Sequence, residues 1–288
     1  SPNKNLLCND KDAFLAGLHI LGVISSKKVH LVCNEQTFSS NLLIPDWVER
    51  HKFTGPHPSG NTGIHVHHID PIDSPESPIF YLSAEDVQAI GKTILFGKLF
   101  NKKIISIGGN VSNPSHIDII RNSQVEDVLH NYKIKSDSMI LSGDVLSGHN
   151  IDLYSGHGYY DSSISILEKS IERPFLGWLS PGFSIYSFSR SFLSYFLNRN
   201  KKYTFNNKRY GSHRTIIPFG YWEEVLPMDI LPTYLIKSII ACDIEEMENL
   251  GIYECSSEDF ALCSYVCQSK VDVSSIIDEG LDYIRENA

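Results

Sequence analysis

The spacing of apolar residues predicts helices alternating with short strands near the start of the chain. Phe14, Leu18 and Leu21 recur at i, i+4 and i+7, which places them on one face of a helix that Asp10 can begin. The continuous apolar run 29–33 is typical of a short buried strand.

A second helix is marked by its end signals. Ser83 and Asp86 have the spacing of a capping-box pair, and Gly97 stands where a helix C-terminus is expected. The apolar segment 104–107 predicts the next strand. Helices alternating with apolar strands favour a layered, Rossmann-like α/β domain over residues 1–102.

The pattern then changes to closely spaced strands. An extended stretch at 115–120, a short helix at 124–130 capped by Ser123, and a strand beginning at Met139 follow the strand at 104–107. Strand, strand, helix, strand within about fifty residues predicts a small β-grasp domain of the SLBB type over residues 103–150.

Two further regions complete the predicted organisation. Residues 151–215 are rich in Ser, Tyr and Phe, and the alternation at 184–188 predicts a strand-rich extension. Residues 216–288 turn helical, with helices expected after Pro232 and over 245–250, 256–267 and 276–285. The apolar stripe of the first of these, Leu235, Ile236, Ile239 and Ile240, favours a helical bundle. The fold class is therefore α/β with a C-terminal helical domain.

Composition excludes several function classes. The chain is 42% hydrophobic and 20% charged, as in soluble globular proteins, and its net charge of −9 argues against nucleic-acid binding. No apolar run approaches the roughly 18 residues that a membrane helix needs. The six cysteines are scattered, which favours a reducing compartment. The chain begins Ser1-Pro2 without a methionine or a signal peptide, and we expect native sequence to precede it.

One stretch near the C-terminus has the register of an iron–sulfur loop, C-x2-C-x2-C-x3-C-P. Cys263 and Cys267 hold the last two ligand places, but Ser257 and Phe260 hold the first two, and Gln268 replaces the closing proline. A cluster needs about four thiolates, and the other nearby cysteines are out of register. The pattern indicates a cluster site that has lost its cluster. Alternatively, the two cysteines are simply small buried side chains one turn apart on a helix.

A histidine-rich segment, 55–71, suggests a metal site. His57, His65, His67 and His68 could supply ligands, with Asp70 as a further partner. No H-E-x-x-H or C-x2-C motif accompanies them, and the glycines do not form G-x-G-x-x-G. A polar surface loop that opens no helix is the favoured interpretation. The sequence predicts no metal, flavin or NAD site.

Several long motifs carry a resemblance to a known family. They are G-P-H-P-S-G…H-x-H-H (55–68), F-Y-L-S-A-E-D-V-Q-A-I-G (80–91), S-G-D-V-L-S-G (142–148), F-L-G-W-L-S-P-G (175–182), S-R-S-F-L-S (189–194), I-P-F-G-Y-W-E-E-V-L-P-M-D-I-L-P-T (217–233) and E-D-F-A-L-C-S-Y-V-C (258–267). In this order, over essentially the whole chain, they resemble the A subunit of the sodium-translocating NADH:quinone reductase. The family's N-terminal region is expected to precede Ser1.

The resemblance implies a function and a place in a complex. The family is similar to the C subunit of the Rnf complex and to the flavin subunit of respiratory complex I, which explains the broken cysteine register. It implies a cofactor-free peripheral subunit, on the cytoplasmic face of the bacterial inner membrane, whose partners are the other subunits of the reductase (B to F). The complex uses flavins and iron–sulfur centres to oxidise NADH, reduces ubiquinone to ubiquinol and pumps Na+ outwards. No catalytic residue is carried over, and the isolated chain is expected to be inactive. Alternatives are an Rnf-type electron carrier with its own redox centre and a metalloprotein built on the histidine segment.

Overall fold

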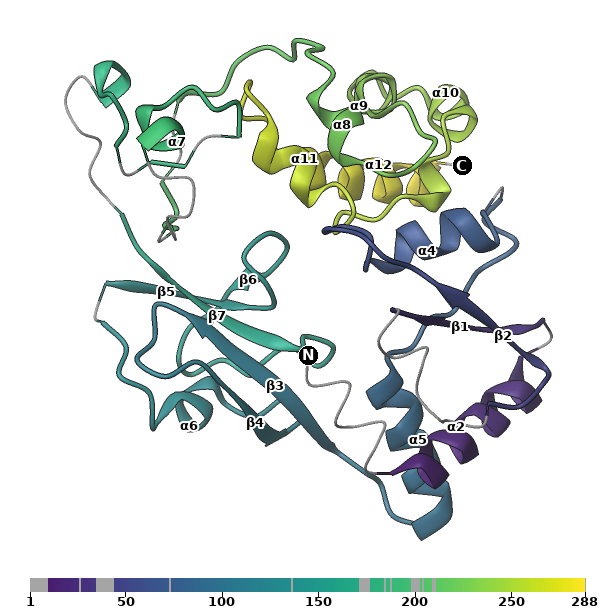
Figure 1. Ribbon diagram of the computed structural model, residues 1–288. Coiled ribbons are helices and arrows are strands. Elements are labelled where there is room, and N and C mark those ends of the chain that lie inside the picture. The colour runs from purple at the N-terminus through teal and green to yellow at the C-terminus, as the bar shows by residue number, and fades with distance from the viewer. Residues whose placement is uncertain are drawn as a thin grey trace. The chain divides into compact units, whose positions relative to one another are not determined.

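The computed structural model describes residues 10–25, 27–34, 44–72, 74–135, 137–170, 177–183, 185–186, 188–197, 203, 205–208 and 211–287 (Figure 1). The chain forms two compact units. The first unit comprises Ser1–Ile104, Asp118–Arg121 and His213–Ala288, and the second comprises Ile105–Ile117 and Asn122–Ser212. The predicted domain boundaries after residues 102, 150 and 215 stay predictions.

The N-terminal part of the first unit contains the predicted helices and strand. Its elements are α2 (Lys11–Ile24), β1 (Val29–Cys33), β2 (Val48–Lys52), α4 (Thr62–Ile69) and α5 (Ala84–Phe96). β1 and β2 pair in parallel, with Val29 opposite Val48. Phe14 and Leu18 of α2 are buried with Val87 of α5, and Leu31 of β1 packs against them. The predicted apolar face of the first helix therefore packs in the core formed by α2, α5 and β1.

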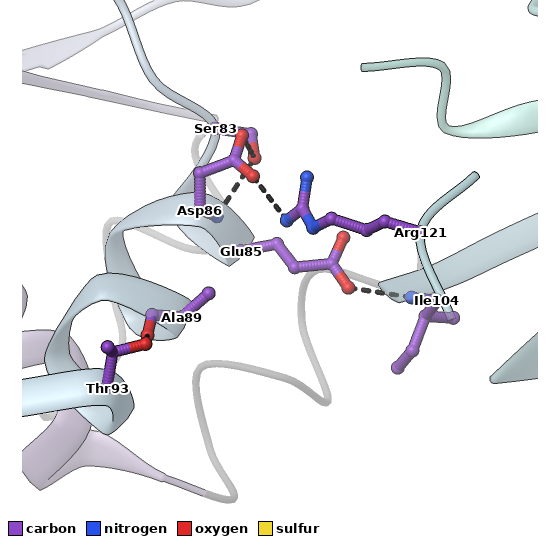
Figure 2. Close-up of polar contacts among 7 residues, drawn as sticks. All are labelled: Ser83, Glu85, Asp86, Ala89, Thr93, Ile104 and Arg121. Carbon is purple, nitrogen blue, oxygen red and sulfur yellow. Dashed lines mark hydrogen bonds and ion pairs between the residues drawn. The ribbon is translucent and has the colours of Figure 1, made fainter. Parts of the chain in front are cut away.

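The ends of α5 confirm the predicted caps. Ser83 Oγ accepts a hydrogen bond from the Asp86 backbone N–H at 3.1 Å, and Gly97 has φ 64°, a left-handed conformation that glycine adopts without strain. Figure 2 shows Arg121 reaching Asp86 at this end, while Glu85 accepts a hydrogen bond from Ile104 N at 2.7 Å. Burial raises the pKa of Glu85. These contacts fasten the start of α5 to the adjoining chain.

The second unit contains most of a five-stranded sheet of order β4-β3-β7-β5-β6. The elements of this region are β3 (Lys102–Gly109), β4 (Ser115–Ile120), α6 (Val125–Leu129), β5 (Ser138–Ser142), β6 (His149–Asn150) and β7 (Ser163–Glu168). β7 pairs in parallel with β3 and antiparallel with β5. The predicted strands at 104–107, 115–120 and from Met139 are confirmed, and α6 is the predicted short helix, with Gln124 in the cap position where Ser123 was expected.

The prediction of a strand at 184–188 is wrong. Ser184 and Ser187 lie outside the described residues, and Ile185, Tyr186 and Phe188 belong to no strand. Alternation requires a sheet against which one face can pack, whereas the Tyr186 ring contacts the rings of Tyr203 and Phe205 instead. The described elements between β7 and residue 215 are η1 (Gly177–Leu179) and α7 (Leu193–Leu197).

The C-terminal region is helical, as predicted. Its elements are α8 (Tyr221–Val225), α9 (Pro232–Ile240), α10 (Ile244–Asn249), η2 (Ile252–Glu254), α11 (Ala261–Val266) and α12 (Val273–Asn287). Leu235, Ile236 and Ile239 are buried in the common core, but Ile240 is 58% exposed. None of the helices in the described ranges is long and apolar enough to span a bilayer. The α/β fold class is confirmed.

One predicted helix boundary in this region is wrong. The helix expected over 256–267 begins only at Ala261. Ser256 Oγ donates to the Asp259 carboxylate at 2.6 Å, and Asp259 N donates to Ser256 O at 3.1 Å. Local side-chain bonds of this kind hold the backbone in a turn instead of a helix.

Candidate functional site

The four positions with iron–sulfur register lie in and beside the core of the C-terminal helices. Cys263 is on α11, Cys267 follows its last residue, and Phe260 precedes its first. The side chains of Phe260 and Cys263 are 0% exposed and Cys267 is 3% exposed, whereas Ser257 is half-buried. A phenyl ring therefore fills one ligand place, and this part of the core is packed. We call residues 256–268 the former cluster loop.

Both thiols are buried in the apolar core of the C-terminal helices. Cys263 Sγ lies 3.9 Å from Trp222 O, and Cys267 Sγ accepts a bond from Val271 N at 3.4 Å. Burial raises the pKa of Cys263 to about 12. A metal ligand must be a thiolate, so Cys263 is poorly prepared for that role. This arrangement agrees with the alternative in which both residues are small apolar side chains.

Cys255 joins this core although it is out of register in the sequence. It is 6% exposed, its Sγ donates to Gly251 O at 3.4 Å, and burial raises its pKa above the ordinary value. Three buried thiols thus belong to one apolar cluster of the described chain. A four-thiolate site needs one more.

The histidine-rich segment contains a helix, which corrects the expectation of a loop. α4 begins at Thr62, and its Ile64 is 1% exposed within the core of the C-terminal helices. The segment has few apolar residues, so a helical period could not be read from it. Its helical state depends on the surface against which Ile64 packs. We call α4 the histidine helix.

Hydrogen bonds from three histidines attach the histidine helix to its surroundings. His67 Nδ1 bonds to Glu254, and its Nε2 accepts from Asp229 N at 3.0 Å, so both ring nitrogens are occupied. His68 Nε2 donates to Pro227 O at 3.0 Å. His65 Nε2 donates to Ser59 O at 3.0 Å, and burial lowers the pKa of His65. Within the described part of the chain, the candidate ligands of this segment, His57, His65, His67 and His68, do not form a group that could hold a metal ion.

The two stretches that the sequence analysis singled out are in direct contact. Asn61 Nδ2, just before α4, donates to Glu258 O at 3.2 Å. Gly63 lies so close to Asp259 that a Cβ there would be 2.8 Å from Asp259 Cγ. Burial raises the pKa of Asp259. The histidine helix and the former cluster loop therefore form one packed contact within the first unit.

A small hollow adjoins the end of the former cluster loop. It is lined by Ile217, Phe219, Gly220, Tyr221, Trp222, Glu223, Thr233, Cys267, Gln268 and Ser269, and its volume of about 260 Å³ includes open solvent. Sites for small organic molecules usually enclose about 300–1,000 Å³. The hollow is small for a quinone ring with its tail.

Comparison with known proteins agrees with the motif resemblance. Residues 2–99 match the family model described as "NqrA second alpha/beta domain". The A subunit of the Na(+)-translocating NADH-quinone reductase of Rhodopirellula baltica is 35% identical over 97% of this chain, and that of Photorhabdus laumondii is 31% identical over 98%. The corresponding protein of Vibrio parahaemolyticus is 34% identical over 98%.

The chain is a homologue of NqrA. The matches cover 61%, 63% and 63% of the three relatives, so the chain spans about three fifths of the length of the NqrA proteins that it matches. The matched region includes both the histidine helix and the former cluster loop. Their contact therefore lies in the part that the chain shares with NqrA.

Proposed function

We propose that this chain acts within a cofactor-free, peripheral subunit of a membrane complex that oxidises NADH, reduces ubiquinone and pumps Na+. The support is its homology to proteins named as the A subunit of the Na(+)-translocating NADH-quinone reductase. On this proposal, the other subunits (B to F) hold the flavins and iron–sulfur centres. The chain docks on these partners at the cytoplasmic face of the bacterial inner membrane, and alone it is inactive.

The observation that carries the cofactor-free role is the filled core around Phe260, Cys263 and Cys267. An iron–sulfur cluster there would need a space that the Phe260 ring occupies. It would also require a thiolate at Cys263, where burial favours the protonated thiol. The Rnf-type alternative, with a redox centre in this loop, has no comparable support.

The histidine-based alternative is also less well supported. His65, His67 and His68 bond to Ser59, Glu254, Asp229 and Pro227, and the bonds of His67 and His68 hold α4 against the C-terminal region. Both ring nitrogens of His67 are engaged, so a metal at His67 would have to displace its bond to Glu254 or to Asp229 N. We infer that the histidine segment has a structural role in this chain.

Purification without oxygen tests the cofactor-free role. Iron, sulfide and flavin should each be far below one equivalent per chain, and NADH should not drive dye reduction by the isolated chain. About four irons or one flavin per chain would overturn the proposal.

A complex-level assay tests the remaining part. The chain, carrying an affinity tag, should co-purify from detergent-treated membranes with Na+-stimulated NADH:quinone reductase activity. Cys263→Ala with Cys267→Ala should retain this activity if the variant still folds, as judged by circular dichroism. Loss of activity in a folded variant would show that these thiols take part in electron transfer.

A further inference from the structure

Three side chains with metal-binding groups share one face of the β1–β2 pair. The parallel register places His30 opposite Glu49 and Val32 opposite His51. Because side chains alternate along a strand, His30 lies on the same face as Glu49 and His51. Leu31, on the other face, packs toward α2 and α5. The core therefore leaves the histidine–glutamate face available.

The ligand atoms of this group converge. His30 Nδ1 lies 3.0 Å from His51 Nε2 and 3.5 Å from Glu49 Oε2. In a tetrahedral site with metal–ligand bonds of about 2.0–2.1 Å, neighbouring ligand atoms are about 3.3 Å apart. The two distances bracket that value. All three ligand atoms lie within 4.8 Å of one another. Among the described residues, His30, Glu49 and His51 are the group of three or more His, Cys, Asp or Glu side chains whose ligand atoms lie this close together.

We propose that His30, Glu49 and His51 bind one divalent cation of the zinc class. Two imidazole nitrogens and one carboxylate oxygen are a donor set that suits zinc and its first-row neighbours, and water completes the coordination. The side chains of His30 and Glu49 are 28% and 41% exposed, so an ion can enter from solvent. The open position makes the site accessible to exchange.

A hydrogen bond between the two histidines does not by itself account for the position of the Glu49 carboxylate. A neutral pair can share one proton between His30 Nδ1 and His51 Nε2, but this leaves Glu49 Oε2 beyond ordinary hydrogen-bond distance. Lys28 pairs with the other oxygen, Oε1. One cation satisfies both imidazoles and Oε2 together, while Lys28 stays paired with Oε1.

A metal here would connect the two strands. β1 and β2 form a two-stranded sheet in the described chain. Ligands from both strands convert their side-chain contact into a cross-link that constrains the register His30–Glu49. The proposed role is structural, and it is independent of the redox function proposed for the complex.

Isothermal titration of the intact chain with ZnCl2, after removal of metals with a chelator, tests the site. One equivalent should bind, and CoCl2 should give the visible absorption of tetrahedral cobalt. His51→Gln and Glu49→Gln should each weaken zinc binding at least about tenfold. His130→Gln, which changes an exposed histidine of the second unit, should leave the affinity unchanged.

Circular dichroism and thermal unfolding without metal establish that the variants fold. If zinc binds the His51→Gln and Glu49→Gln proteins as tightly as the unmodified chain, the ion lies elsewhere and the proposal is wrong. If the unmodified chain binds no zinc ion tightly, the proposal is refuted as well.

Discussion

Replacing Gly63 by alanine tests the contact between the histidine helix and the former cluster loop. A Cβ at this position would lie 2.8 Å from Asp259 Cγ and closer still to its Oδ2, under the 3.0 Å that real Cβ contacts respect. Asp259 is 1% exposed and cannot swing freely into solvent. The backbone of α4 or the Asp259 carboxylate must therefore move.

The expected cost combines three effects. Overpacking a filled site costs about 1–3 kcal/mol. Moving the Asp259 carboxylate weakens its 2.6 Å hydrogen bond from Ser256, which contributes about 1.5 kcal/mol or more because the acceptor is charged. Alanine favours a helix over glycine by about 1 kcal/mol, which offsets part of the loss. We expect Gly63→Ala to lower the free energy of unfolding by about 2–3 kcal/mol.

Urea unfolding followed by tryptophan fluorescence measures this change. Trp47 and Trp222 belong to the first unit, which contains the altered contact. With a denaturant slope of about 2–3 kcal/mol/M, the midpoint should fall by about 1 M. Gly60→Ala is the matched control: Gly60 lies close to Gly63 in the chain, and a Cβ there would meet no atom within 4 Å. Its effect should be within about 0.5 kcal/mol.

A double variant separates the clash from a general effect on α4. Asp259→Ala removes the obstructing carboxylate, so Gly63→Ala should cost less in that background than in the unmodified chain, by at least about 1 kcal/mol. If Gly63→Ala is as stable as Gly60→Ala, or if the two substitutions are additive, the close approach described here is wrong.

Three further predictions concern charge and thiol chemistry. Burial raises the pKa of Asp259, so its contribution to stability is fully present below its ordinary pKa of 3.8 and declines as pH rises above that value. Asp259→Asn should therefore gain stability relative to the unmodified chain as pH rises above 3.8 in urea titrations, and no gain would contradict the assigned cause. Asp86→Asn removes a carboxylate that neutralises the buried charge of Arg121, and it should lower the free energy of unfolding by about 2–4 kcal/mol in the same assay. Asp282→Asn breaks an ion pair in which both side chains are more than half exposed, so it should cost under about 0.5 kcal/mol. Equal effects of the two substitutions would refute the distinction between buried and exposed pairs. A thiol reagent at about pH 8 should label exposed Cys242 rapidly and buried Cys263 only on unfolding. Peptide mass spectrometry measures the two labelling rates, and comparable rates would mean that the core around Cys263 opens readily.

Elements with local end signals could be predicted from the sequence. Ser83, Asp86 and Gly97 specify both ends of α5 through contacts within a few residues, and Pro232 sets the start of α9 through its fixed φ. The order of long motifs was equally local information, and it predicted the relation to NqrA that the comparisons confirm.

Other features depend on partners distant in sequence. α4 has little apolar periodicity, and Ile64 stabilises it only because the C-terminal helices provide a core for that side chain. The alternation at 184–188 predicted a strand wrongly: the described residues there, Ile185, Tyr186 and Phe188, belong to no strand, and the Tyr186 ring contacts Tyr203 and Phe205. Cys255 joined Cys263 in one cluster although its spacing excluded it from the loop register.

The sequence by itself determined most of the secondary-structure order and the main apolar faces, because residue identity and short spacing are sufficient for these. It also showed that Ser257 and Phe260 stand at two of the four cysteine positions of the iron–sulfur register. Tertiary structure decided that the histidine helix packs on the former cluster loop. It also brought His30 to Glu49 and His51. The physical reason is the separation of the residues in the sequence: His30 is about 20 positions from Glu49 and His51, and the histidine helix is about 200 positions from the former cluster loop. Strand register and core packing, not local propensity, set the distances between such residues.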